Sequence, residues 1–260
     1  MARILRLAVI ACVLAAPIPP LAAHDAGKDG AMRFEDHAAS APIVSVTWGA
    51  AVAPGAGREV TLGTGVGEIV CRYHAPDGRA PETTAATRAV LWVFGAGGGL
   101  GGPAGGVYER LAERLAREHG IASLRLDYRH PGDLDACIVD ARAGLDWLCA
   151  AGAIRRVALV GHSFGGAVVI AVGSDPRVST VVAMSSQTLG ADGADAIAPR
   201  PLLVLHGEDD EVLPAACSRW IHRRAREPKR LILYPGARHG LDQCRDALDR
   251  DLIDWLLANA

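Results

Sequence analysis

A serine flanked by glycines stands at residue 163, in the sequence Gly161-His162-Ser163-Phe164-Gly165. An apolar run precedes it and small residues follow it, a pattern that predicts a strand, a sharp turn and a helix. Such a turn presents a serine hydroxyl at the carboxyl edge of a parallel sheet, because glycines tolerate the crowding on both sides. Chance gives roughly 0.1 matches to G-x-S-x-G in a chain this rich in glycine. The motif favours a nucleophilic Ser163 over a glycine-rich turn that carries an incidental serine.

A serine nucleophile needs a general base, and three histidines follow Ser163: His206, His222 and His239. His206 ends a predicted strand before a glycine, a position that shapes a turn. His222 lies among positive charges in a predicted helix and is interpreted as a solvated residue. His239 stands in a glycine-containing loop just after the last predicted strand, from which it can reach the serine. We therefore expect His239 to be the base.

The imidazole in turn needs a carboxylate to orient it. Four carboxylates follow the penultimate predicted strand: Glu208, Asp209, Asp210 and Glu211. Some of them can cap the helix that is predicted to begin near Pro214, but only one or two can do so. We favour Asp210 as the acid and place Asp209 second. Asp192 and Asp195, after an earlier strand, are a third choice.

Acyl transfer also requires two amide N–H groups for the oxyanion of the tetrahedral intermediate. One is expected from Phe164, directly after the nucleophile. The other is expected from Ala96 or Gly97, in the glycine-rich loop after the apolar strand Ala89–Phe94. Glycine in this loop lets a substrate carbonyl approach the backbone closely.

The same loop has a rival interpretation as a dinucleotide-binding turn. Gly97, Gly99 and Gly102 match G-x-G-x-x-G, and Asp127 stands near the place where a ribose-binding carboxylate is expected. The serine motif, the acidic turn and the histidine loop together favour the hydrolase interpretation. A third interpretation is a non-catalytic binding protein on the same fold.

The elements that carry these residues alternate along the chain. Predicted strands cover Ile43–Trp48, Val60–Thr64, Glu68–His74, Ala89–Phe94, Ala122–Asp127, Arg156–Val160, Val178–Met184, Leu202–His206 and Arg230–Tyr234. Helices are predicted between the later strands and at the end, from Gln243 to Leu257. Short apolar strands that alternate with helices predict an α/β fold with a doubly wound, mostly parallel sheet. Ligands bind at the carboxyl ends of such strands, where all the residues above are expected.

The remainder of the chain sets limits on its organisation and partners. The 260 residues suit one domain, predicted at 42–260, and a net charge of −2 without a basic stripe argues against a nucleic-acid partner. Residues 1–23 resemble a signal peptide, with a basic start and a short apolar run, so export to the periplasm or outside is expected and lipid anchoring is disfavoured. Residues 24–41 are expected to be a flexible lead-in. Cys217 and Cys244 are the favoured disulfide pair.

From about Glu68 to Leu257 the chain resembles the α/β-hydrolase superfamily. The resemblance is carried by Gly161–Gly166, by His206-Gly207-Glu208-Asp209-Asp210 and by Gly236–Gly240. The last segment especially resembles dienelactone-hydrolase-like proteins and small bacterial esterases. In this superfamily the last position of H-G-x-x-D carries the acid, which implies Asp210.

Two departures from the resemblance matter. Dienelactone hydrolases proper use a cysteine nucleophile where this chain has Ser163, so their substrate is not implied. The superfamily's common His-Gly before the oxyanion loop is Phe94-Gly95 here. The short connection from Ser185 to Leu202 leaves no room for a large cap domain, so the cleft is expected to be open, with Arg129, His130 and Gln187 as candidate cleft residues. The expectation is an exported, cofactor-free and metal-free serine hydrolase that acts on a small acyl substrate, with no integral membrane span and an oligomeric state left open.

Overall fold

The computed structural model describes residues 41–150 and 153–260. The predicted signal peptide lies outside the described residues, as does the predicted lead-in up to residue 40. Among the described residues no helix is both long and apolar enough to cross a membrane.

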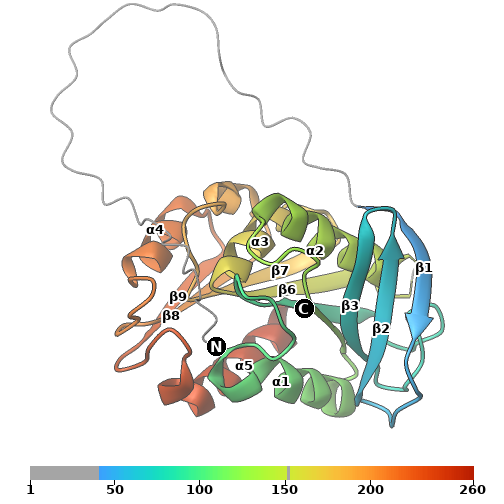
Figure 1. Ribbon diagram of the computed structural model, residues 1–260. Helices are drawn as coiled ribbons and strands as arrows, with labels where there is room; N and C mark the ends of the chain where they lie inside the picture. Colours follow the sequence, from blue (N-terminus) through green and yellow to red (C-terminus); the bar gives the residue numbers. More distant parts are fainter. Residues whose placement is uncertain (1–40, 151–152) are drawn as a thin grey trace, which may run out of the picture. The chain divides into compact units, whose positions relative to one another are not determined.

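Nine strands form one sheet in the described part of the chain (Figure 1). They are β1 (Ile43–Trp48), β2 (Gly57–Thr64), β3 (Gly67–His74), β4 (Arg88–Val93), β5 (Ala122–Leu126), β6 (Arg156–His162), β7 (Val178–Met184), β8 (Leu202–Gly207) and β9 (Lys229–Tyr234). Their order across the sheet is β1-β2-β3-β5-β4-β6-β7-β8-β9. Neighbouring strands from β5 to β9 are parallel, whereas β1, β2 and β3 are antiparallel to their neighbours. The doubly wound, mostly parallel sheet that the sequence predicts is confirmed.

Helices cover both faces of this sheet. They are α1 (Pro103–His119), α2 (Leu134–Cys149), α3 (Phe164–Val172), α4 (Ala216–Arg224) and α5 (Arg245–Asn259). The core has one apolar cluster that includes residues of α2, α3 and α4 and a second that includes residues of α1 and α5. Figure 1 shows these two helical layers above and below the sheet.

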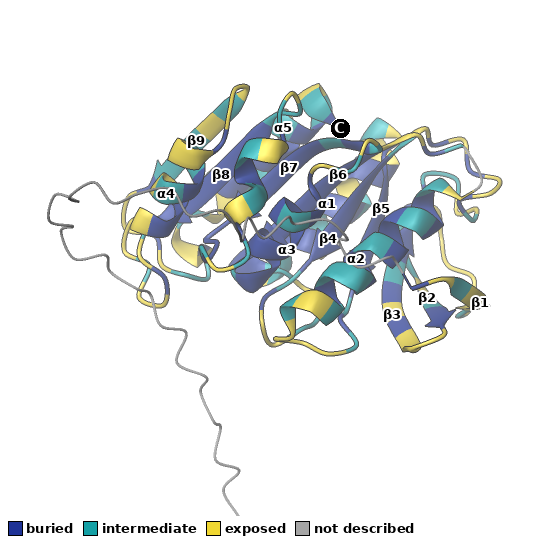
Figure 2. Cartoon of the chain, turned by 90° about the horizontal axis from the view of Figure 1, so that it is seen from above, coloured by how far each residue is buried: buried dark blue, intermediate teal, exposed yellow. Residues whose placement is uncertain are grey.

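The central strands are apolar on both sides because both faces are covered. In β4, Leu91 and Val93 belong to the first cluster, and Val90 and Trp92 belong to the second. In Figure 2 the inner strands are accordingly buried along most of their length. The packing of these central strands fixes where the loops at their carboxyl ends begin.

The connection between β7 and β8 contains only a short 3₁₀ helix, Asp192–Ala196. No cap domain is inserted among the described residues, as the sequence predicts.

The expected disulfide is wrong. Cys217 and Cys244 form no disulfide bond in the described part of the chain. Cys217 belongs to α4 and Cys244 packs against the cluster of α1 and α5, so the sheet separates them. The sequence places both cysteines in helical segments, but it does not show that these segments cover opposite faces of the sheet.

Candidate active site

Ser163 lies in a tight turn between β6 and α3, where its φ is 57° and its ψ is −121°. This strained conformation is rare for a residue with a side chain. The glycines beside it leave no room for a methyl group. A Cβ on Gly161 would lie 2.1 Å from the carbonyl oxygen of Gly165, and one on Gly165 would lie 2.2 Å from that of Phe94. The turn therefore requires glycine at both positions and holds Ser163 at the sheet edge.

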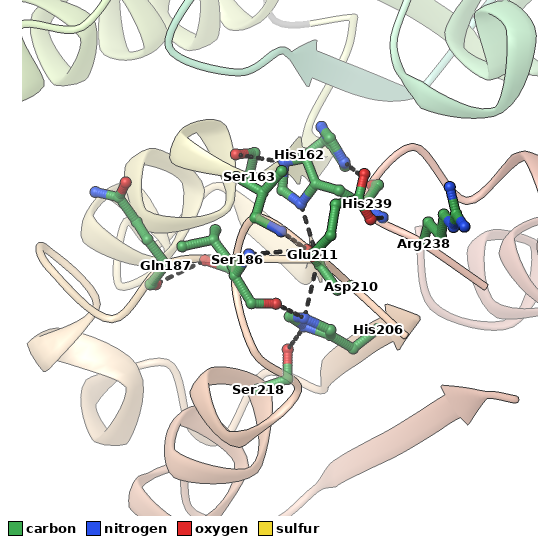
Figure 3. A network of polar contacts seen from close by, with 12 residues as sticks. His162, Ser163, Ser186, Gln187, His206, Asp210, Glu211, Ser218, Arg238 and His239 are labelled. Carbon is green, nitrogen blue, oxygen red and sulfur yellow. Dashed lines mark hydrogen bonds and ion pairs between the residues drawn. The ribbon is translucent and has the colours of Figure 1, made fainter. Parts of the chain in front are cut away.

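His239 lies between two other polar side chains (Figure 3). Its Nδ1 is 2.8 Å from Oδ2 of Asp210, and its Nε2 is 3.1 Å from Oγ of Ser163. A carboxylate only accepts hydrogen bonds, so Nδ1 carries the hydrogen and the neutral ring leaves Nε2 as an acceptor for the hydroxyl. The structure thus brings together the predicted nucleophile, base and acid, which are delivered by the loops after β6, β9 and β8.

The Asp210 carboxylate is fully buried and receives several donors. Its Oδ1 accepts the amide N–H groups of Val212 and Leu213 at 2.9 and 2.8 Å. Its Oδ2 faces His239 and also lies 3.1 Å from Nε2 of His206. Burial alone would raise the pKa of Asp210, but hydrogen bonds from His206, His239 and the two amides outweigh it and hold the pKa well below its usual range. The carboxylate is therefore charged at neutral pH and can stabilise a cationic imidazole.

The other carboxylates considered from sequence do not contact the histidine side chain. Asp209 is exposed, and its amide N–H bonds the carbonyl of Ala237. Asp192 and Asp195 belong to the 3₁₀ helix between β7 and β8, where Asp195 lies 4.0 Å from Arg226. The structure brings Asp210, the favoured choice, to His239.

The backbone of the His239 loop is held from three directions. The amide N–H of His239 bonds Glu211 at 3.3 Å, and its carbonyl oxygen lies 2.9 Å from Nε2 of His162. The next carbonyl, that of Gly240, accepts the amide N–H of Ala104 at 2.7 Å. These contacts fix the loop independently of the imidazole ring.

His162 is a member of this site to which the sequence assigned no role. Burial lowers its pKa to about 4, so the ring is neutral near pH 7. It stacks on Phe94 with a centroid distance of 5.5 Å and lies 4.8 Å from the His239 ring. Its position beside Ser163 in the motif was the one available signal, but spacing gave no hint that its ring turns toward the base.

The two segments that carry the expected oxyanion donors both begin next to Ser163. Phe164 is the first residue of α3, and an amide there has no partner within its helix. Gly95 lies against Ser163, since a Cβ built on it would be 3.6 Å from the serine Cβ. Ala96 and Gly97 follow directly, and no described residue accepts a hydrogen bond from their amides. The amides of Phe164, Ala96 and Gly97 are therefore not occupied by an acceptor among the described residues, and their role as oxyanion donors stays a prediction.

The glycine-rich loop is anchored in a way that argues against dinucleotide binding. The carboxylate of Asp127 accepts the amide N–H of Gly99 at 2.6 Å, so it is engaged by the loop itself. The first turn of α1 is also distorted, because Ala104, Gly105 and Gly106 have φ values of 50°, 61° and 86°. The phosphate site of a dinucleotide-binding turn uses the N-terminus of a regular helix, and the first turn of α1 is not regular.

The three candidate cleft residues have different surroundings. The side chain of Arg129 is not free, because it pairs with the buried Asp140 and donates to the carbonyl of Val66. His130 is exposed. Gln187 is buried and donates to the carbonyl of Leu189. Sequence could not separate these cases, since all three follow strand ends.

Within the described residues, no three side chains of His, Cys, Asp or Glu gather closely enough to hold a metal ion. The arrangement can take a proton from Ser163, hold it on His239 and neutralise it with Asp210. That chemistry belongs to a nucleophilic hydrolase site.

Known proteins share the fold and part of the sequence. The profile of the Dienelactone hydrolase family matches residues 108–251. The Escherichia coli protein YfhR is 28% identical over 131 residues, which cover 40% of this chain and 46% of YfhR, so the match spans less than half of that relative's length.

Two solved structures illustrate the shared fold. Est1E from Butyrivibrio proteoclasticus superposes with a TM-score of 0.65 at 17% identity, covering 77% of this chain and 98% of Est1E. XC6422 from Xanthomonas campestris, described as an α/β serine hydrolase without lid, has a TM-score of 0.59 at 21% identity, covering 78% and 96%.

Proposed function

Because the chain belongs to the dienelactone hydrolase family, we propose that it is a serine hydrolase that cleaves carboxylic esters through Ser163, His239 and Asp210. The observation that carries the proposal is the continuous line of contacts from the Ser163 hydroxyl through both nitrogens of His239 to the Asp210 carboxylate. The residue at the nucleophile position is serine, so the proposal does not extend to the dienelactone substrate of cysteine-dependent relatives.

In the proposed mechanism, Oγ of Ser163 attacks the ester carbonyl carbon while Nε2 of His239 takes its proton. Asp210 stabilises the resulting imidazolium. Amides of Phe164 and of Ala96 or Gly97 bind the oxyanion, and the intermediate collapses when His239 protonates the leaving alkoxide. Water then attacks the acyl-enzyme with His239 again as base, which releases the carboxylic acid and restores the serine.

The absence of a cap domain among the described residues supports small, soluble esters over substrates that need a deep tunnel. Thioesters and amides use the same chemistry, and the fold does not separate them. A panel of nitrophenyl esters of increasing acyl length, run beside thioester and amide panels, would define the preferred bond.

The main test is labelling with a fluorophosphonate probe, which reacts with activated serines. We expect the wild-type protein to be labelled and Ser163→Ala to be unlabelled, with the matched control Ser174→Ala, an exposed serine, labelled as wild type. Ester turnover should fall by about 10⁶-fold in Ser163→Ala, as in other triad enzymes. An unlabelled wild-type protein would favour a non-catalytic binding protein instead, and undiminished labelling of Ser163→Ala would refute Ser163 as the nucleophile.

We also propose that the protein is exported, on the basis of the signal-peptide pattern in residues 1–23. Expression of the full chain in a bacterial host, followed by fractionation and mass measurement, tests this proposal. A mature form that begins at residue 24 outside the cytoplasm is expected, and an uncleaved cytoplasmic form would refute it.

A further inference from the structure

A second histidine contacts the carboxylate of the proposed triad. His206 is in β8, four residues before Asp210, and its side chain has no exposed surface. A fully buried histidine is costly to keep unless its ring nitrogens find partners. In the proposed mechanism this residue takes no part, so its contacts require an explanation of their own.

Both ring nitrogens of His206 are engaged (Figure 3). Nδ1 lies 2.7 Å from Oγ of Ser218 on α4. Nε2 lies 2.9 Å from the carbonyl oxygen of Leu213 and 3.1 Å from Oδ2 of Asp210. Carbonyl and carboxylate oxygens only accept, so Nε2 must carry the hydrogen and share it between them.

The Oδ2 atom of Asp210 consequently has two imidazole donors. One is Nδ1 of His239 and the other is Nε2 of His206. Oδ1 is occupied by the two backbone amides of the turn. Each donor stabilises the charged carboxylate, and both draw on the same negative charge. The hydrogen bond from His206 therefore weakens the attraction between Asp210 and His239.

We propose that His206 is a positioning residue of the site, which fixes Oδ2 of Asp210 toward His239 and limits how strongly Asp210 retains the protonated imidazole. The proposal rests on the proposed function, because it assigns His206 a role in the same reaction. Ser218 serves this arrangement by holding Nδ1, since a hydroxyl that donates to Nδ1 makes the Nε2–H group a better donor.

Other titratable and charged groups surround this line of side chains. His162 from β6 faces both His239 and Asp210, and it is neutral because burial lowers its pKa to about 4. The carboxylate of Glu211 accepts the amide N–H of His239. On the α4 side, Arg219 is 3.6 Å from Glu208, and both are half exposed. All these groups remain in place in the variants described next, so they do not alter the comparison.

The test measures the pH dependence of kcat/KM for a nitrophenyl ester in His206→Phe and His206→Gln. Phenylalanine removes the donor to Asp210, so the carboxylate holds the imidazolium more strongly and a higher pH is needed to free the base. We expect the acid limb of the profile to move to higher pH by about 0.5 to 1 unit. We also expect kcat to fall about tenfold at the optimum, because the carboxylate is no longer fixed. Glutamine can place an N–H group near the position that Nε2 of His206 occupies in the wild-type protein. Both the shift of the acid limb and the loss of kcat should therefore be smaller in His206→Gln than in His206→Phe.

Two further variants keep the test decisive. Ser218→Ala leaves the imidazole in place but removes its Nδ1 partner, and it should shift the acid limb in the same direction by a smaller amount. His222→Gln, on the partly exposed surface of α4, is the matched histidine control and should leave the profile unchanged. If His206→Phe does not fold, the glutamine and alanine variants decide the question.

An acid limb that stays within 0.1 unit of wild type in all folded variants of His206 and Ser218 would overturn the proposal, even if the rates fall. A purely structural role lowers the rate at every pH without moving the limb. The proposed function fails separately, since that failure would appear as absent labelling and turnover in the wild-type protein.

Discussion

Two glycine-rich turns face each other at the carboxyl edge of the sheet, and they contain glycine for different reasons. In the serine turn, Gly161 and Gly165 are enclosed by backbone, with carbonyl oxygens about 2 Å from any added Cβ. In the loop after β4, Gly97 and Gly101 have nothing within 4 Å of an added Cβ. Backbone packing requires glycine at positions 161 and 165, whereas Gly97 and Gly101 border open space. Gly97 and Gly101 therefore leave room for a molecule outside the chain, whereas Gly98 and Gly102 of the same loop are crowded by neighbouring side chains.

The largest expected effect concerns the serine turn. Gly165→Ala places a methyl group 2.2 Å from the carbonyl oxygen of Phe94. This oxygen belongs to the backbone, so it cannot move aside as a flexible side chain would. We expect the free energy of unfolding to drop by about 4 kcal/mol or more, measured by urea denaturation. A loss below about 1 kcal/mol would contradict the view that packing alone enforces glycine here.

The next effect concerns His162, which lies in the serine turn and stacks on Phe94 at the start of the other loop. Burial lowers its pKa from 6.5 to about 4 in the folded protein. As the pH falls, His162 therefore binds a proton in the unfolded chain before it does so in the folded protein. Its contribution to the free energy of unfolding is fully present above about pH 6.5 and is lost as the pH falls toward 4. The loss from this one group amounts to at most about 3 kcal/mol.

Denaturation curves between pH 7 and 4 check this expectation. His162→Gln should flatten the decline in the free energy of unfolding, although His74, whose pKa burial also lowers to about 4, will still contribute. In His130→Gln, which replaces an exposed histidine, the free energy of unfolding should decline with falling pH as it does in the wild-type protein. Parallel curves for wild type and His162→Gln would show that His162 is not the group that titrates.

A smaller effect is expected where the second turn is anchored. Asp127→Ala frees the amide of Gly99, which the carboxylate holds at 2.6 Å. We expect about 1 kcal/mol less stability and roughly a tenfold lower kcat/KM, because the amides of Ala96 and Gly97 lose their fixed geometry. The exposed Asp254→Ala should change neither quantity. Equal kcat/KM in Asp127→Ala and wild type would mean that the loop does not act on the substrate.

The smallest effects belong to the open glycines. Gly97→Ala and Gly101→Ala should each change the free energy of unfolding by no more than about 0.5 kcal/mol. Gly97→Ala should nevertheless lower kcat/KM several-fold, since Gly97 is a candidate oxyanion donor two residues after Gly95, which lies against Ser163, whereas Gly101→Ala should not. If the two variants behave alike in turnover, the space beside Gly97 does not receive the substrate.

Much of the fold could be predicted because strand and helix periods are local properties. All nine predicted strands are confirmed, with boundaries shifted by a few residues, and α5 begins at Arg245 where Gln243 was expected. The predicted serine, aspartate and histidine are also brought together, since residues that follow parallel strands meet at one edge. Their catalytic roles stay predictions until the labelling experiment is done.

The features that the sequence did not reveal have a common physical origin. Arg129 follows a strand end as Ser163, Asp210 and His239 do, but its guanidinium reaches back to Asp140. Cys217 and Cys244 belong to helices on opposite faces of the sheet. The first-turn distortion of α1 at Ala104 was not foreseen, because a left-handed alanine leaves no mark in residue pattern. In each case the direction of a side chain or of an entire element decided the outcome.

The amino-acid sequence by itself determined the order of the elements, the glycines of the serine turn and the identities of the groups that can do acyl chemistry, because each depends on residues close together in the chain. Only the tertiary structure decided how the His239 ring lies against Ser163, and that His162 contacts the His239 loop and His206 the Asp210 carboxylate. Those relations depend on rotamers and on the packing of loops that lie tens of residues apart, and no local pattern encodes them.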